Sequence, residues 1–94
     1  MSHALIDEPV DMLVSFRDNR VIPKRMRWNM RDYDIKTVNL VHTAREGAKR
    51  VFYFSISDGF TSARGGSASG GNYFKLKLDP ESLEWRLVET YTDG

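Results

Sequence analysis

The sequence predicts an all-β protein: a single small antiparallel meander of about six strands, folded as a curved sheet or as a partly open SH3-like barrel. Apolar residues recur at every second position in several short segments, the spacing of strands that bury one face. Turn-forming residues separate these segments, and no stretch keeps the period of a helix for long. Together these observations favour strands throughout.

The composition limits what this domain can do. Ninety-four residues suffice for one domain with a thin core. The chain has no cysteine, which excludes disulfides, thiolate metal sites and thiol catalysis. The N-terminal region carries Asp7 and Glu8 and lacks the features of a signal peptide, and no apolar run is long enough to cross a bilayer. We therefore expect a cytoplasmic protein without membrane contact.

The N-terminal part is expected to contain a tail and one strand. Residues 1–9 are predicted to form a flexible acidic tail, and residues 10–94 the β domain. The first strand is expected over 10–16, where four apolar residues alternate: Val10, Met12, Val14 and Phe16. Asp18 and Asn19 then indicate a turn.

A β-hairpin is predicted between Pro23 and Ile35, with residues 29–32 as its loop. This register pairs chemically matched residues across the hairpin: Trp28 with Tyr33, Arg27 with Asp34, and Met26 with Ile35. Alternation directs Trp28 and Tyr33 into the core.

The next strand is expected over 33–43, with a slip in its apolar phase. The inward positions are Tyr33, Ile35, Val38, Leu40 and His42. A slip of one residue within a strand predicts a β-bulge, and bulges curve a sheet. On this phase His42 lies on the inner face, and we expect it to be a hydrogen-bonded structural residue rather than a metal ligand.

Three further segments complete the predicted sheet. A strand over 49–57 carries Phe52, Phe54 and Ile56 on one face, and a strand over 73–79 carries Phe74, Leu76 and Leu78. The closing strand covers 84–91. A flexible Gly/Ser loop is expected over 58–72, and because it joins two strands and leads into no helix, it is not a phosphate-binding loop.

Charge distribution gives the first of two hypotheses about function. Net charge is +1, yet residues 17–31 hold six basic groups against the single acid Asp18. Basic residues interleaved with aromatic ones are typical of nucleic-acid binding. The candidate residues for phosphate contact are Arg17, Arg20, Lys24, Arg25 and Arg31.

The second hypothesis is a protein-interaction module that binds a peptide or strand of a partner. Three aromatic residues lie out of phase with the core or in a loop and are its candidates: Tyr53, Tyr73 and Phe60. Oligomeric state stays open on either hypothesis.

Catalytic and metal chemistry are not expected. His3 and His42 are the only histidines, and no carboxylates are spaced as an acid–base pair or a ligand cluster. We therefore predict no catalytic residues, no metal and no cofactor.

Two groups of residues resemble a family of uncharacterised small bacterial β domains that also occur at the C-terminus of Y-family DNA-polymerase-like (mutasome-type) proteins. The matching residues are Pro23, Met26, Trp28, Arg31, Tyr33 and Ile35, then Tyr73, Phe74, Leu76, Leu78 and Asp79, and finally Trp85, Leu87, Val88 and Tyr91. The resemblance implies an antiparallel β fold and a link to nucleic acid or to a DNA-repair protein. It also implies glycine at the position of Met30, in a tight hairpin turn.

Overall fold

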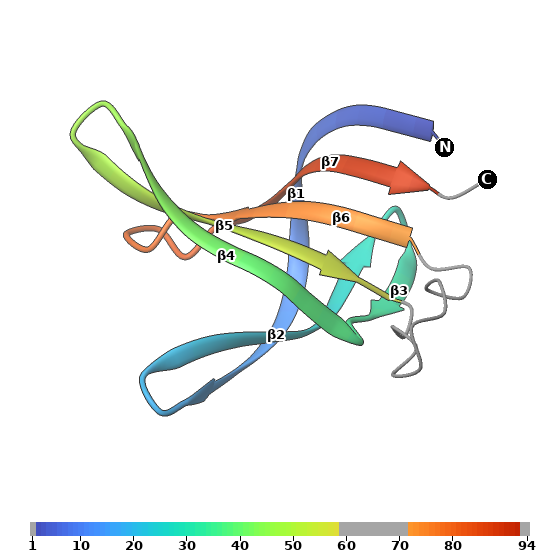
Figure 1. The fold of residues 1–94 in the computed structure, drawn as a ribbon, viewed down its shortest axis with the longest axis horizontal. Coiled ribbons are helices and arrows are strands. Elements are labelled where there is room, and N and C mark those ends of the chain that lie inside the picture. Colours follow the sequence, from blue (N-terminus) through green and yellow to red (C-terminus); the bar gives the residue numbers. More distant parts are fainter. Residues whose placement is uncertain (1, 59–71, 93–94) are drawn as a thin grey trace.

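Seven strands make up residues 2–58 and 72–92, the part of the chain that a computed structural model describes. They form one open antiparallel sheet in the order β3-β2-β1-β7-β6-β5-β4, without a helix in the described residues (Figure 1). This confirms the predicted all-β antiparallel fold. The strands are β1 (Ser2–Arg17), β2 (Arg20–Trp28), β3 (Arg31–Asp34), β4 (Thr37–Glu46), β5 (Lys49–Ser57), β6 (Asn72–Leu78) and β7 (Trp85–Thr92).

The described residues 2–9 are the first half of β1, so the prediction of a tail over 1–9 is wrong. Residues 2–5 and 8–10 pair with β7. Between them Asp7, with φ of 53°, bulges out of the register, and its Oδ1 accepts a hydrogen bond from Arg86 Nε at 3.0 Å. Acidic residues suggested a solvated segment, but β7 supplies backbone partners and Arg86 neutralises the charge.

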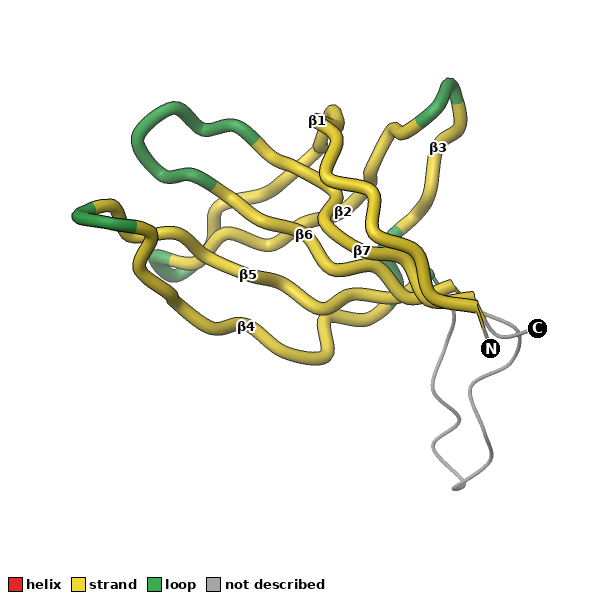
Figure 2. Tube along the Cα trace, turned by 90° about the horizontal axis from the view of Figure 1, so that it is seen from above, coloured by secondary structure: helices red, strands yellow, loops and turns green. Residues whose placement is uncertain are grey.

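β1 is sixteen residues long and serves two neighbouring strands. Residues 2–10 lie against β7, and residues 11–17 lie against β2. In Figures 1 and 2 the β1–β2, β4–β5 and β6–β7 turns lie at the left end of the molecule, opposite the two termini. The second half of β1 thus pairs with β2 and does not pair with β7.

The β2–β3 hairpin turns more tightly than predicted. Its pairs are Arg25 with Asp34, Met26 with Tyr33, Arg27 with Asp32, and Trp28 with Arg31. The loop is thus Asn29 and Met30 alone, with φ of 55° and 63°, the left-handed pair that a type I′ turn requires. The register with residues 29–32 as the loop is wrong because Met30 adopts the conformation that usually needs glycine.

Replacing Met30 with glycine is expected to stabilise the protein by about 0.5–1 kcal/mol. Met30 is 88% exposed, so its removal costs little packing. Relief of the left-handed strain, about 1–2 kcal/mol, exceeds the extra chain entropy that glycine brings to the unfolded state. Urea denaturation measures the change. Met30→Ala keeps the Cβ atom and hence the strain, so equal stability of the glycine and alanine variants would contradict this account.

β3 and β4 follow one another in the chain but lie at opposite edges of the sheet. The two residues between them are held from both sides: Ile35 N–H donates to the Lys24 carbonyl oxygen at 2.9 Å, and Lys36 N–H donates to the Ser57 carbonyl oxygen at 2.9 Å. The single strand predicted over 33–43 is therefore wrong, because the chain changes partner from β2 to β5 at this junction. The sheet must curl to allow this.

A bulge appears as a register shift between Val38 and Leu40, later in the chain than the slip between Ile35 and Val38 from which a bulge was predicted. Val38 pairs with Ile56 and Val41 with Phe54, so both valines lie on the inner face. Leu40 and His42 lie on the outer face, and the prediction that they point inward is wrong because the bulge changes the phase. His42 is exposed and stacks on Tyr53, with ring centroids 5.2 Å apart.

The core lies on the inner face of the curled sheet. The alternation predicted for β5 and β6 is confirmed, and Trp28 and Tyr33 pack against the core as predicted. The buried cluster consists of Met26, Phe54, Ile56, Phe74, Leu76, Leu78, Trp85 and Leu87.

Asp58 and Asn72 close the base of the segment between β5 and β6. Asn72 N–H donates to Asp58 Oδ1 at 2.6 Å, and the Asn72 amide nitrogen donates to Oδ2 at 3.2 Å. The loop predicted over 58–72 otherwise lies outside the described residues, which exclude 59–71.

Candidate functional site

The five basic residues proposed for phosphate contact do not come together. Arg17 and Arg20 pair across the β1–β2 turn, and Lys24 lies further along β2. Arg25 Nε donates to Asp34 Oδ1 at 2.8 Å, which raises the pKa of Arg25 and lowers the pKa of Asp34. Arg31 pairs with Trp28, eight residues or about 26 Å along β2 from Arg20.

Arg31 instead contacts an aromatic ring of the same hairpin. Its guanidinium carbon is 5.8 Å from the centroid of the Tyr33 ring, within the range of a cation–π contact. Among the five, Arg17, Arg20 and Lys24 therefore remain as charges without a described ionic partner, and only Arg17 and Arg20 lie together at the end of the β1–β2 hairpin.

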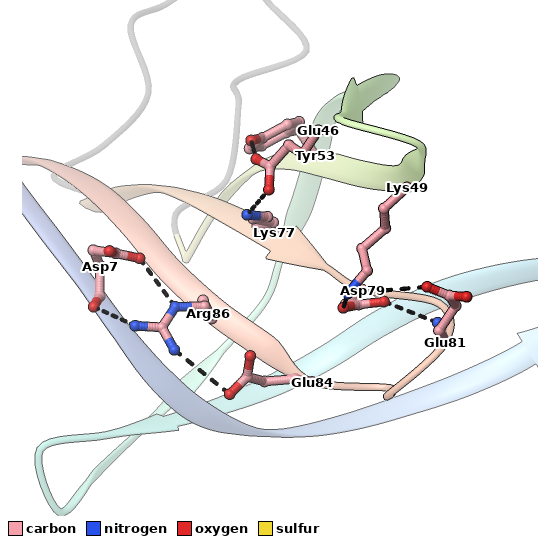
Figure 3. A network of polar contacts seen from close by, with 9 residues as sticks. All are labelled: Asp7, Glu46, Lys49, Tyr53, Lys77, Asp79, Glu81, Glu84 and Arg86. Carbon is pink, nitrogen blue, oxygen red and sulfur yellow. Dashed lines mark hydrogen bonds and ion pairs between the residues drawn. The ribbon is translucent and has the colours of Figure 1, made fainter.

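A self-paired polar network covers the outer face over β5, β6 and β7 (Figure 3). Glu46 accepts hydrogen bonds from the Tyr53 hydroxyl at 2.8 Å and from Lys77 Nζ. Burial, followed by this contact with Glu46, raises the pKa of Tyr53. Arg86 is held by Asp7 and, at 3.5 Å, by Glu84.

The three aromatic residues proposed for a partner interface differ in where they lie. Tyr53 lies on this outer face with its hydroxyl already bonded. Tyr73 lies on the same face, half-buried and opposite Tyr91. Phe60 lies outside the described residues. Because Lys77 and Arg86 on this face are paired with carboxylates, it offers little attraction to a polyanion.

Asp79 anchors the β6–β7 turn. Its carboxylate accepts hydrogen bonds from Lys49 Nζ at 2.7 Å and from the Glu81 N–H at 2.9 Å. These contacts, that with Lys49 above all, lower the pKa of Asp79 from 3.8 to about 2. The backbone bonds from Asp79 N–H to the Glu84 oxygen at 3.0 Å and from Leu83 N–H to the Asp79 oxygen at 2.7 Å close the turn.

Asp79→Asn is expected to lower stability at neutral pH and to weaken its dependence on acid. The pKa of Asp79 is about 2 in the folded protein and 3.8 ordinarily, so its contribution is complete above about pH 4 and is lost as pH falls towards about 2. Urea denaturation over this pH range measures it. Asp11→Asn, an exposed change outside the network, is the control, and an unchanged acid dependence in Asp79→Asn would contradict the assignment.

An apolar hollow of about 620 Å³ opens at the end of the sheet that carries the three turns. β1 and β2 form one wall, β4 and β5 the other, and the β6–β7 turn closes the bottom. Its lining is eight apolar residues with one amide and one guanidinium: Phe16, Val21, Val41, Phe52, Phe54, Leu78, Pro80 and Leu83, with Asn19 and Arg20. Much of its rim is open to solvent, since Phe16 is 74%, Leu83 67% and Val41 49% exposed.

The lengths of the strands explain why the hollow exists. β3 is only four residues long and pairs with residues 25–28 of β2. Among the described strands, none therefore lies on that side of residues 20–24 of β2, while β4 continues for ten residues beyond the junction. The predicted apolar face of the first strand ends in Phe16, which here lines the opening instead of lying in the closed core.

β4 is an edge strand with an unusual surface. Among the described strands it is hydrogen-bonded to β5 alone. Val38, Leu40 and Val41 are 39%, 56% and 49% exposed, and charged residues appear only at its end. Natural sheets usually protect such edges with lysine, proline or bulges. The bulge at Val38 leaves residues 40–46 in regular register, so this stretch is free to pair with a further strand.

Sequence reasoning did not single out this site. The signal was present as an apolar run, Val38 to Val41, in a strand whose first charged residue is Arg45. It could not show that β4 lies at an edge, because that depends on the partner change at residues 35 and 36.

Neither histidine belongs to a group of three potential metal ligands among the residues that the structure describes. His3 stacks on Tyr91 with centroids 4.5 Å apart, and its Nε2 lies 3.3 Å from Glu89 Oε2. Within residues 2–58 and 72–92 no three potential ligands among His, Cys, Asp and Glu come together, and no helix there could span a membrane.

Comparison of the chain with models of protein families, with curated proteins and with solved structures finds no match.

Proposed function

We propose that this domain is a non-catalytic binding module that takes an extended segment of a cytoplasmic protein as an additional strand along β4. The observation that carries the proposal is the edge of β4: seven regular residues, apolar and exposed side chains, and no strand on one side among those described. Strand addition of this kind takes its affinity from backbone hydrogen bonds and its specificity from pockets for alternate side chains.

The hollow supplies such a pocket. Val41 belongs both to the edge strand and to the wall of the hollow. Side chains on the inner face of an added strand would lie beside Val41 and Thr43, above apolar surface, and those on the outer face beside Leu40 and His42. The polar lining residues, Asn19 and Arg20, include no general acid or base, which supports binding without catalysis.

Leu40→Lys is expected to abolish binding of peptides selected against the wild-type domain. The selection uses a display library of random peptides that match the ten residues of β4 in length. A lysine on an edge strand opposes pairing with a further strand, and Leu40 is 56% exposed, so the fold tolerates the change. Fluorescence anisotropy of the labelled peptides measures binding.

Leu13→Lys is the matched control, because Leu13 is 60% exposed but lies on β1. It is expected to leave affinity unchanged. Hydrogen exchange should slow in β4 when peptide is bound. Binding that survives Leu40→Lys, or a library that yields no binder, would contradict strand addition.

Nucleic-acid binding is the second candidate function. The resemblance to DNA-repair-associated domains also favours it. The supporting observation is that Arg17, Arg20 and Lys24 have no described ionic partner, and that Arg17 and Arg20 lie opposite each other. Three phosphate contacts would weaken binding to duplex DNA about fortyfold between about 50 and about 200 mM salt. Anisotropy of labelled DNA at the two salt concentrations tests it, and no binding at the lower one would count against it.

A further inference from the structure

We propose that the segment bound along β4 carries an acidic residue next to its apolar ones, and that Arg20 recognises this residue. The inference rests on the proposed strand addition and names the chemistry of the partner. Val41 and Arg20 line the same hollow from opposite walls. A strand that lies along β4 therefore passes within the space that Arg20 borders.

Among the described residues that line this hollow, Arg20 alone is charged. Arg17 faces it across the β1–β2 turn, and like charges directly opposite repel each other. Asp18 lies between them in the chain, so two positive charges stand against one negative charge. A carboxylate placed at the rim would relieve this repulsion and would gain charge-assisted hydrogen bonds.

Three other cations of the sheet contrast with this pair. Arg25, Lys77 and Arg86 each lie within ion-pair distance of a carboxylate. In the part of the chain that the structure describes, neither Arg17 nor Arg20 has such a neighbour. The positive potential at this rim is therefore not cancelled by the protein itself.

A second hollow of about 580 Å³ shows that the sign of charge is specific to the β4 side. It shares four lining residues with the first, namely Phe16, Val21, Leu78 and Leu83. Asp11 and Glu84 also line it, and no residue of β4 does. A basic side chain in the bound segment would be drawn to that hollow, away from the edge strand. An acidic side chain is the complement of the hollow beside β4.

The inference is tested by reversing the charge of one residue in the peptide and of one residue in the protein. The probes are peptides selected from the random library against the wild-type domain, and we expect apolar residues at alternate positions with at least one Asp or Glu. Replacing that acid with lysine is expected to weaken binding to the wild type about tenfold. The same lysine peptide is expected to regain the lost affinity with Arg20→Glu.

Arg31→Glu is the matched control, because it changes net charge equally at the far end of β2. It is expected to leave both affinities unchanged. Peptides that need Leu40 but are indifferent to the charge at residue 20, or that are enriched in basic residues, would overturn the inference and leave strand addition standing. A library without binders, or binding that Leu40→Lys does not affect, would overturn strand addition and this inference with it.

Discussion

Replacement of Leu87 with alanine is expected to lower the free energy of unfolding by about 3–5 kcal/mol. Leu87 is 0% exposed and pairs with Leu76, which is also 0% exposed. Both residues belong to strands with a neighbour on each side, so the backbone cannot easily collapse into the cavity. A domain of this size is stable by only about 5–15 kcal/mol in total, and the loss is therefore a large share.

Leu5→Ala is the matched control for this measurement. Leu5 also lies opposite β7 but is 75% exposed, and its truncation is expected to change stability by less than about 0.5 kcal/mol. Urea denaturation compares the two variants. Leu87→Val removes fewer atoms and gives a milder loss if the alanine variant does not fold. Equal losses for Leu87→Ala and Leu5→Ala would show that the core lies elsewhere.

The central strands could be predicted from the sequence because their side chains report their surroundings directly. Phe52, Phe54 and Ile56 alternate with polar residues, and so do the apolar residues of β6. Alternation states which face is buried, and it correctly located that face for both strands. The prediction needed no knowledge of which strand lies next to which.

The prediction of the hairpin register was wrong because of the conformation of the turn residues themselves. A two-residue turn needs two left-handed residues, and the sequence offers glycine in neither place. Asn29 adopts this conformation readily. Met30 adopts it because the pairing of Arg25 with Asp34 and of Met26 with Tyr33 outweighs the strain. The conformational preference of each turn residue does not show whether the strand pairs that the turn allows will outweigh its strain.

The prediction of the candidate site was wrong because the site depends on how distant strands are arranged. The basic residues were close in sequence, but eight residues of extended β2 separate the two ends of the group, and Asp34 neutralises Arg25. The hollow, in contrast, combines residues from five strands and two turns that no local pattern relates. Its position depends on where β3 ends, and so on the change of partner at the junction.

That junction can be tested directly, because Lys36→Pro removes the N–H that donates to the Ser57 carbonyl oxygen. Ser57 is 3% exposed, so water has little access to replace the donor, and loss of a buried backbone hydrogen bond costs about 1–3 kcal/mol. The proline also restricts Ile35, whose own N–H bonds to Lys24. We expect a loss of about 2–3 kcal/mol in the free energy of unfolding and faster hydrogen exchange in β4.

Lys36→Ala is the control, since both variants lose the lysine side chain and alanine keeps the N–H. It is expected to lie within about 0.5 kcal/mol of the wild type. The comparison separates the backbone effects of proline from the loss of the lysine side chain. The hydrogen bond that proline removes ties the start of edge strand β4 to β5, immediately after Ile35 is tied to β2. If the proline variant were as stable as the alanine variant, this junction would not be what curls the sheet, and the opening beside β4 would need another cause.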